Sequence, residues 1–151
     1  MTGRLDTMQA VVLDAKLDIF ADELDARQAV ADHYASILGN LVEIPSLSAG
    51  ATSSWAQYTV KLPQGIDRDA ISAKLGEIGV PTAIYYPIPM HMQPPYQHYP
   101  VAGNGLNGNG LARNELSVTH DLCNRVMALP MHPYLSADDQ DIIASKIRSV
   151  L

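Results

Sequence analysis

Cysteine, tryptophan, phenylalanine and positive charge are all scarce in this sequence of 151 residues. The single cysteine, Cys123, cannot form an intrachain disulfide, which favours a reducing compartment and a cytoplasmic location. Asp and Glu number 16 against 10 Lys and Arg, so the formal net charge is −6 and a nucleic-acid partner is not expected. No apolar run approaches the roughly 18 residues of a membrane span. The N-terminal residues have no apolar region after a basic one and are not expected to be a signal peptide; with the acidic net charge, no membrane partner is predicted.

What the chain does contain is enough apolar residues, 47%, to build the core of one folded domain. Apolar spacing, capping residues and helix-ending glycines predict the helices, whereas runs of β-formers and extended pieces before prolines predict the strands. Helices are predicted over residues 6–17, 23–38, 68–78, 115–125 and from Ser136 to the C-terminus; strands are predicted at 55–62 and 82–86, with shorter extended pieces at 41–44 and 126–131.

The first predicted helix, residues 6–17, is unusual because apolar residues occur on nearly all its sides. Met8, Val11, Val12 and Leu13 do not fall on a single stripe. A helix that is hydrophobic all round is normally buried. On the surface of a monomer it would expose an apolar patch of the kind that marks an interface. The sequence therefore predicts that this helix docks in a homo-oligomer or against a larger partner domain.

The Pro-rich segment, which we define as residues 82–96, is the strongest candidate for a binding site. Its prolines fix φ and drive the preceding residues into extended conformations. The polar side chains of Tyr85, Tyr86, His91 and Gln93 therefore extend from a stiff backbone just after a predicted strand. Loops of this kind often carry function. The sequence leaves two interpretations open, a structural turn with packed tyrosines and a ligand site.

Other chemical motifs are weak. Residues 103–108 match the G-x-G-x-x-G pattern, but no strand precedes them and the glycines belong to a flexible Gly/Asn run. His91 and His98 would need a third ligand to hold a metal ion. His120 and Asp121 are adjacent, which is awkward for a base and its orienting carboxylate. The lysines lie on predicted helices or strands with a solvated face, at positions 16, 61, 74 and 146.

Several short motifs, taken in order, resemble a known family. They lie at residues 4–10, 26–28, 34, 55–58, 79–82, 85–93 and 129–136. In this order and spacing they are similar to the C-terminal part of the DegT/DnrJ/EryC1/StrS family. Its members are pyridoxal-phosphate-dependent nucleotide-sugar aminotransferases of fold type I. The Tyr-Tyr-Pro-x-Pro-x-His-x-Gln form most resembles members that act on UDP-linked 3-keto sugars.

The resemblance implies an α+β fold, in which a small antiparallel or mixed β-sheet has helices on one face and is preceded by N-terminal helices. Residues 1–40 would be an N-terminal helical segment at the domain or subunit interface. Residues 41–151 would be the small C-terminal domain. The large domain of the family, with its Schiff-base lysine, has no counterpart in the sequence. Accordingly, the chain alone is expected to hold no cofactor and no catalytic residue.

The resemblance also implies substrate contacts. In the family, an arginine at the position of Arg4 faces the active site of the neighbouring subunit. The residues at Tyr85 and Tyr86 line the sugar-nucleotide site, often as His-Tyr, and His91 and Gln93 lie on the same loop. The family asparagine that helps hold the cofactor phosphate is replaced here by Thr2.

The expected function is therefore that of a C-terminal domain fragment of a sugar-nucleotide aminotransferase. The intact enzyme would transfer an amino group from glutamate to a UDP-linked keto sugar, and this chain alone would be inactive. A UDP-sugar is a possible ligand, and a homo-oligomer is expected through the N-terminal apolar helix. Two alternatives remain: a free-standing, non-enzymatic oligomerisation domain or truncated gene product, and a small-molecule binder that uses the Pro-rich segment alone.

Overall fold

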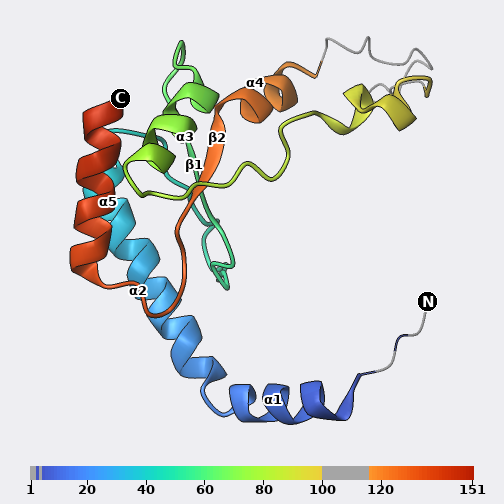
Figure 1. The fold of residues 1–151 in the computed structure, drawn as a ribbon, viewed down its shortest axis with the longest axis vertical. Coiled ribbons are helices and arrows are strands. Elements are labelled where there is room, and N and C mark those ends of the chain that lie inside the picture. Colours follow the sequence, from blue (N-terminus) through green and yellow to red (C-terminus); the bar gives the residue numbers. More distant parts are fainter. Residues whose placement is uncertain (1–2, 4, 100–115) are drawn as a thin grey trace.

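Two short antiparallel strands, β1 (Tyr58–Lys61) and β2 (Val126–Leu129), lie at the centre of the fold (Figure 1). The structure is a computed structural model that describes Gly3 and residues 5–99 and 116–151. Single bridges from Glu43 to Lys61 and from Ala83 to Ala128 widen the sheet on either side. The remaining elements, in chain order, are α1 (Thr7–Leu17), α2 (Phe20–Leu38), α3 (Arg68–Glu77), the 3₁₀ turns η1 (Met90–Met92) and η2 (Pro94–Tyr96), α4 (Ser117–Arg125) and α5 (Ala137–Val150).

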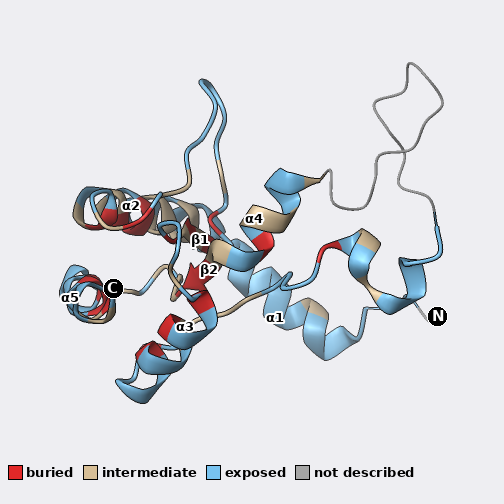
Figure 2. Ribbon diagram, turned by 90° about the horizontal axis from the view of Figure 1, so that it is seen from above, coloured by how far each residue is buried: buried red, intermediate tan, exposed pale blue. Residues whose placement is uncertain are grey.

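Helices cover one face of the sheet, and no helix packs on the opposite face among the described residues. The register places Tyr58 opposite Leu129 and Val60 opposite Met127, and all four side chains are buried in the core. Helices α2, α3 and α5 lie together on that side of the strands (Figure 2). The opposite face carries small residues such as Ala128, which is paired with Ala83. The predicted fold, a small antiparallel sheet with helices on one face, is confirmed.

The predicted helix ends are confirmed where capping chemistry defines them. Asp67 accepts hydrogen bonds from the backbone N–H groups of Asp69 and Ala70 and so begins α3, and Gly79, with φ of +82°, follows its end. Ser136 caps α5 in the same way, accepting from the N–H of Asp139. The α2 helix begins at Phe20, earlier than predicted, which narrows the break after α1.

The predicted strand at 82–86 is wrong beyond Ala83. Only Ala83 pairs with β2; the prolines that follow cannot donate to a ladder, and they disfavour continued pairing. The predicted strand at 55–62 begins only at Tyr58, because Trp55 adopts a turn conformation with φ of +46°. The predicted start of α4 at Glu115 and the predicted flexible loop at 101–110 lie outside the described residues.

A few buried polar side chains connect the helices and strands. Tyr34 on α2 donates its hydroxyl to the carbonyl of Pro130, at 3.1 Å. Arg68, almost fully buried at the start of α3, donates to the carbonyl of Cys123 in the last turn of α4 and pairs with Asp69. A cation is favourable there because the carbonyl end of a helix carries partial negative charge. Cys123 itself is buried.

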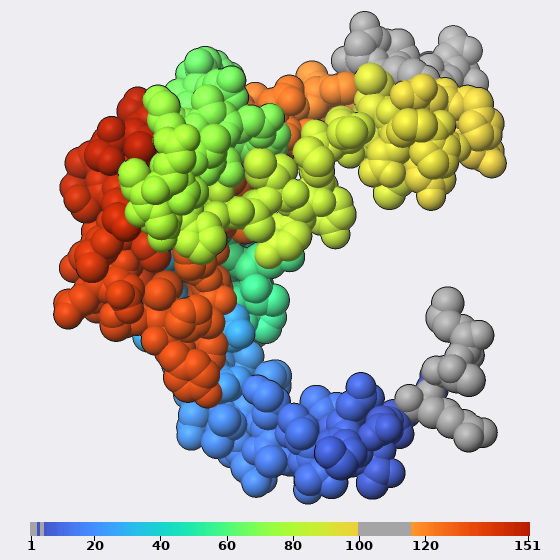
Figure 3. Space-filling model, viewed as in Figure 1, coloured from blue at the N-terminus to red at the C-terminus, as the bar shows by residue number. Residues whose placement is uncertain are grey.

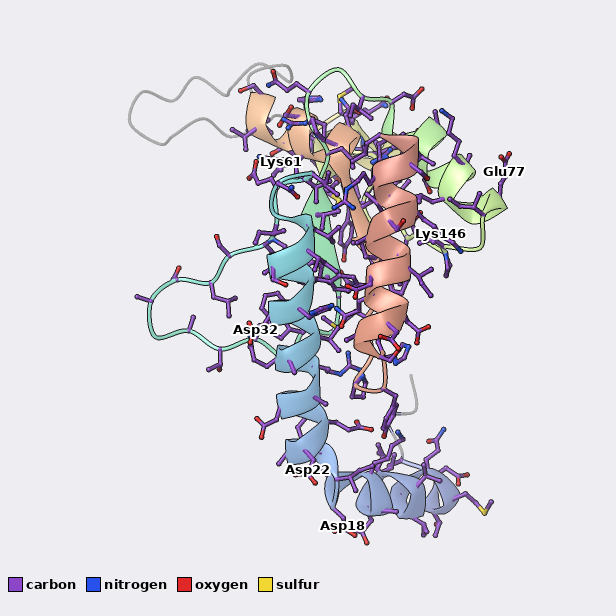
Figure 4. All side chains as sticks on the ribbon, turned by 90° about the vertical axis from the view of Figure 1, so that its left-hand side faces the viewer. Asp18, Asp22, Asp32, Lys61, Glu77 and Lys146 are labelled. Carbon is purple, nitrogen blue, oxygen red and sulfur yellow. The ribbon has the colours of Figure 1, made fainter. Side chains whose placement is uncertain are left out.

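Helix α1 contributes no buried residue to the core. It projects from the start of α2, and the acidic residues Asp18 and Asp22 lie at the corner between the two helices (Figure 4). In the space-filling view, α1 and residues 90–99 form the two ends of a C-shaped outline (Figure 3). Apolar side chains on every side of α1 are exposed, as the all-round pattern implies for a helix without a partner. None of the helices covered by the structure is long and apolar enough to cross a bilayer.

Candidate substrate wall on the open face of the sheet

The Pro-rich segment is attached to the sheet at its start and extends away from it. The hydroxyls of Thr82 and Ser72, on α3, are 2.7 Å apart, and Ala83 forms its bridge to β2. After that bridge the chain runs outward through η1 and η2 (Figure 1). The side-chain amide of Gln97 donates to the carbonyl of Met92, at 2.7 Å, which joins the two 3₁₀ turns. The segment is thus ordered by its own hydrogen bonds and by one sheet contact.

Tyr85 and Tyr86 are both exposed, at 52% and 77% of their surface. Tyr85 lines a pocket of about 240 Å³ on the open face of the sheet. The other residues that line this pocket are Ala56, Gln57, Pro81, Thr82, Ala83, Ala128, Leu129, Pro130 and Met131. Since Pro87 follows Tyr86 and restricts its backbone, the phenol group of Tyr86 is presented with less backbone entropy left to lose on binding.

His91 meets a histidine from a different element, His120 on α4. Their Nε2 atoms are 3.2 Å apart, and the rings are nearly perpendicular, with centroids 5.1 Å apart. The carboxylate of Asp121 is held by Arg125 through both oxygens, at 3.0 and 2.8 Å. That ion pair takes up the carboxylate that a His120–Asp121 acid–base pair would use.

The structure describes Gln93 but not Arg4, the two remaining predicted substrate contacts. Gln93 is half-buried between η1 and η2, where its carbonyl accepts from the N–H of Tyr96. Arg4 lies outside the described residues, as does the G-x-G-x-x-G match at 103–108. The structure thus brings Tyr85, Tyr86, His91 and Gln93 along one segment. It does not join them into a single pocket, because only Tyr85 borders the hollow on the sheet.

The lysines do not fit a Schiff-base site for pyridoxal phosphate. Lys61 forms an ion pair with Glu43, at 2.6 Å, and Lys146 donates to the carbonyl of Ile78, at 2.6 Å (Figure 4). Lys16 and Lys74 are exposed on helices. A lysine that forms an imine needs a desolvated amine, whereas these four amines are exposed or engaged with other groups.

A second hollow lies on α1. It has a volume of about 480 Å³ and is lined by Leu5, Met8, Gln9, Val12, Leu13 and Lys16. Leu5, Met8 and Val12 are each more than half exposed. A contiguous apolar surface on an element with no core contacts is typical of an interface. This hollow is distant from the Pro-rich segment, at the other end of the C-shaped outline (Figure 3).

These features define a class of domain: a small helix-backed sheet with an exposed aromatic segment at one edge and an apolar helical arm. The chain belongs to the DegT/DnrJ/EryC1/StrS aminotransferase family, whose model matches residues 1–148.

Two curated relatives share 36% of aligned residues with this chain. A UDP-2-acetamido-2-deoxy-3-oxo-D-glucuronate aminotransferase of Pseudomonas aeruginosa matches over 148 residues, 97% of this chain and 37% of that protein. A UDP-N-acetyl-3-dehydro-alpha-D-glucosamine 3-aminotransferase of Acidithiobacillus ferrooxidans matches over 150 residues, 99% of this chain and 37% of that protein. The chain therefore spans about 37% of the length of these relatives.

Solved structures support the same conclusion. A DegT DnrJ EryC1 StrS aminotransferase from Brucella abortus is 44% identical, with a TM-score of 0.81 over 97% of this chain and 36% of that one. DesV of S. venezuelae, solved in complex with a ketimine intermediate, is 26% identical, with a TM-score of 0.79 and the same coverage. The fold and the family agree with the resemblance read from the motifs.

The sequence did not predict the meeting of His91 with His120. The two residues are 29 positions apart and have no shared motif, so only the packing of α4 reveals it. The pocket beside Tyr85 carried a clearer signal. Its lining includes Leu129, Pro130 and Met131, which belong to one of the motifs shared with the family.

Proposed function

We propose that this chain forms the small-domain wall of a sugar-nucleotide cleft in a pyridoxal-phosphate-dependent aminotransferase, and that it does not transfer amino groups by itself. Tyr85, Tyr86, His91 and Gln93, with Arg4, are the proposed substrate contacts, and a UDP-linked keto sugar is the proposed substrate. Residues 41–151 are proposed as the small domain, and residues 1–40 as the segment that docks it.

The observation that carries the proposal is that Tyr85 lines the pocket on the open face of the sheet, with the exposed Tyr86 next to it in the chain. Both relatives at 36% identity are named as aminotransferases of UDP-sugars. A wall with phenol groups and a shallow pocket suits a polar, ring-shaped ligand, because apolar faces with a few placed hydrogen-bonding groups are typical of small-molecule sites.

The cofactor half of the proposal is tested by titrating the purified chain with pyridoxal phosphate and following absorbance. We expect no saturable aldimine band and no amino transfer from glutamate, because the lysines are exposed or engaged elsewhere. A saturable band accompanied by turnover would overturn this part.

The substrate half is tested by saturation-transfer NMR with a UDP-sugar. We expect weak saturable binding that Tyr85→Ala and Tyr86→Ala each reduce. Tyr134→Ala is the control, since Tyr134 is a tyrosine in the turn before α5 that is exposed at 72%, close to the 77% of Tyr86. Equal effects of all three substitutions would mean that the signal comes from nonspecific contact with exposed phenols.

A second candidate function, a non-enzymatic oligomerisation domain, is supported by the apolar hollow on α1. It is compatible with the first, because a docking helix serves both an enzyme subunit and a free-standing domain. We propose that the hollow is covered by another copy of the chain.

A further inference from the structure

We propose that a pocket between α2 and residues 45–58 binds a small organic ammonium ion, with Asp32 and Tyr58 as its polar contacts. The pocket has a volume of about 230 Å³. Its walls include Gln28, Asp32, Pro45, Leu47, Trp55 and Tyr58. None of the residues that line it borders the pocket beside Tyr85, so the two sites are separate. The proposal therefore does not depend on the sugar-nucleotide role.

The hydroxyl of Tyr58 is the first observation that points to a ligand. Tyr58 is only 1% exposed, and its hydroxyl has no hydrogen-bond partner among the described residues. A buried hydroxyl without a partner is costly and rare. Burial raises the pKa of Tyr58 to about 12, and the charge of Asp32 adds to the increase, so the hydroxyl lies toward that carboxylate. A ligand that donates to the phenol oxygen would supply the missing partner.

The other polar groups of the pocket leave a further acceptor for the same ligand. Gln28 is engaged at both ends of its amide. Its oxygen accepts from the indole N–H of Trp55, at 2.8 Å, and its nitrogen donates to Oδ1 of Asp32, also at 2.8 Å. Oδ2 of Asp32 has no partner among the described residues and is exposed, so a ligand can reach it. Asp32 lies on α2 (Figure 4).

Charge selects a cation over an anion or a neutral molecule. Asp32 carries the only formal charge among the described residues that line the pocket. The rings of Trp55 and Tyr58, with centroids 5.7 Å apart, add π faces that attract a cation. Pro45 and Leu47 provide apolar surface for a hydrocarbon group. An ammonium group on a small hydrocarbon matches this combination of a few polar groups on apolar walls.

Trp55 is held in place before any ligand binds. Its φ of +46° is unusual for a bulky residue. The bond to Gln28 and a bond from Arg27 to its backbone carbonyl, at 3.0 Å, fix this conformation. The latter bond also turns the guanidinium of Arg27 to a carbonyl. Strained residues that their surroundings hold in place are common at ligand sites.

The test uses the full chain and the fluorescence of Trp55, which is the only tryptophan in the sequence. The probes are benzylammonium, benzyl alcohol and benzoate, which share a ring and differ in charge. We expect a saturable change with benzylammonium at millimolar concentration. Benzyl alcohol should bind at least about fivefold more weakly, because it lacks the charge, and benzoate more weakly still.

Three variants assign the contacts. Tyr58→Phe keeps the ring and should weaken benzylammonium binding about tenfold, since hydrogen bonds to charged groups are the stronger ones. Asp32→Asn should weaken it about threefold to fivefold, because the carboxylate is exposed and its charge is screened. Asp25→Asn, which removes the same charge from an exposed position on α2 outside the pocket, should bind as the wild type does.

Urea unfolding shows whether each variant folds, and the exposed Asp32→Asn keeps the test valid if Tyr58→Phe is destabilised. The proposal is overturned if benzylammonium gives no saturable change at millimolar concentration, since the hydroxyl of Tyr58 would then be satisfied by solvent. It is equally overturned if benzyl alcohol binds as tightly as benzylammonium. An Asp25→Asn effect as large as that of Asp32→Asn would also overturn it, because the overall negative charge would then attract the probe.

Discussion

The side-chain amide of Gln140 donates a 2.8 Å hydrogen bond to the backbone carbonyl of Val30, joining the first turn of α5 to α2. Both residues are almost fully buried, at 2% and 5% exposure. A buried amide is tolerated only when it is hydrogen-bonded. This bond therefore fixes how α5 is placed along α2, besides the apolar packing between them.

Replacing Gln140 tests that bond. We expect Gln140→Met, which keeps the volume, to lower the free energy of unfolding by about 1 kcal/mol. Gln140→Ala should cost about 2–3 kcal/mol, because it also leaves a cavity. Ile142→Ala, at a half-exposed position on the same helix, should cost less. Urea unfolding measures all three, and equal losses for Met and Ala would show that the hydrogen bond dominates.

Two buried tyrosines should respond differently to removal of their hydroxyls. Tyr34→Phe loses the bond to Pro130 and should cost about 1–2 kcal/mol. The hydroxyl of Tyr58 is buried and has no hydrogen-bond partner among the described residues. Tyr58→Phe should therefore leave stability unchanged or raise it, since both rings keep their contact at 5.1 Å. Urea unfolding measures the free energy of unfolding of both variants. If Tyr58→Phe lowers it as much as Tyr34→Phe does, the hydroxyl of Tyr58 is hydrogen-bonded in the folded chain.

The same tyrosines predict a loss of stability at alkaline pH. Burial, and to a lesser degree the charge of Asp32, raise the pKa of Tyr58 from 10.0 to about 12. Burial raises the pKa of Tyr34 further, aided by the charges of Tyr58 and Asp139. The folded chain holds these protons more tightly than the unfolded chain. Their contribution is thus complete below pH 10 and is lost as the pH rises through 10 toward 12.

Urea midpoints measured across that range check this expectation. Tyrosinate absorbance should show Tyr34 and Tyr58 ionising only as the chain unfolds. Tyr58→Phe should flatten the fall in stability with pH. An unchanged slope in that variant would assign the alkaline loss to other groups.

The apolar hollow on α1 gives a matched pair of substitutions. Val12 lines the hollow and Val11 does not, although both are more than half exposed. If a second copy covers the hollow, Val12→Glu should dissociate the assembly and Val11→Glu should not. Neither should change monomer stability by more than about 0.5 kcal/mol, as is usual for surface substitutions. Light scattering measures the mass, and a wild type that stays monomeric at all concentrations would rule out self-association.

Local chemistry made the helices predictable. Asp67 and Ser136 each accept from backbone N–H groups of the first turn, and Gly79 has the positive φ that follows a helix end. Such signals lie within a few residues of the boundaries that they set. The small sheet with helices on one face was predicted from the motifs shared with the family, because their order indicates which elements follow one another.

The sheet and the site were less predictable because they depend on distant partners. Residues 82–86 have a strand composition, but the segment pairs only at Ala83 before the prolines turn it outward. Trp55 looks like the start of a strand, yet its indole N–H donates to Gln28 and its carbonyl accepts from Arg27, which holds it in a turn. The contact of His91 with His120 depends likewise on packing across 29 positions.

The continuity of α2 has a mechanical consequence. Its 19 residues make a rod of about 28 Å. Its fully buried residues, Val30, Ala31, Tyr34 and Leu38, all lie in its C-terminal half, whereas its N-terminal half, held by the bonds of Glu23 to Tyr134 and of Arg27 to Trp55, carries α1. The C-terminal half of α2 is thus anchored in the core, whereas α1 is attached at its opposite end. Since α5 packs on α2 and α1 lies at the other end of α2, a small tilt of α2 against α5 would displace α1 further than it displaces the core.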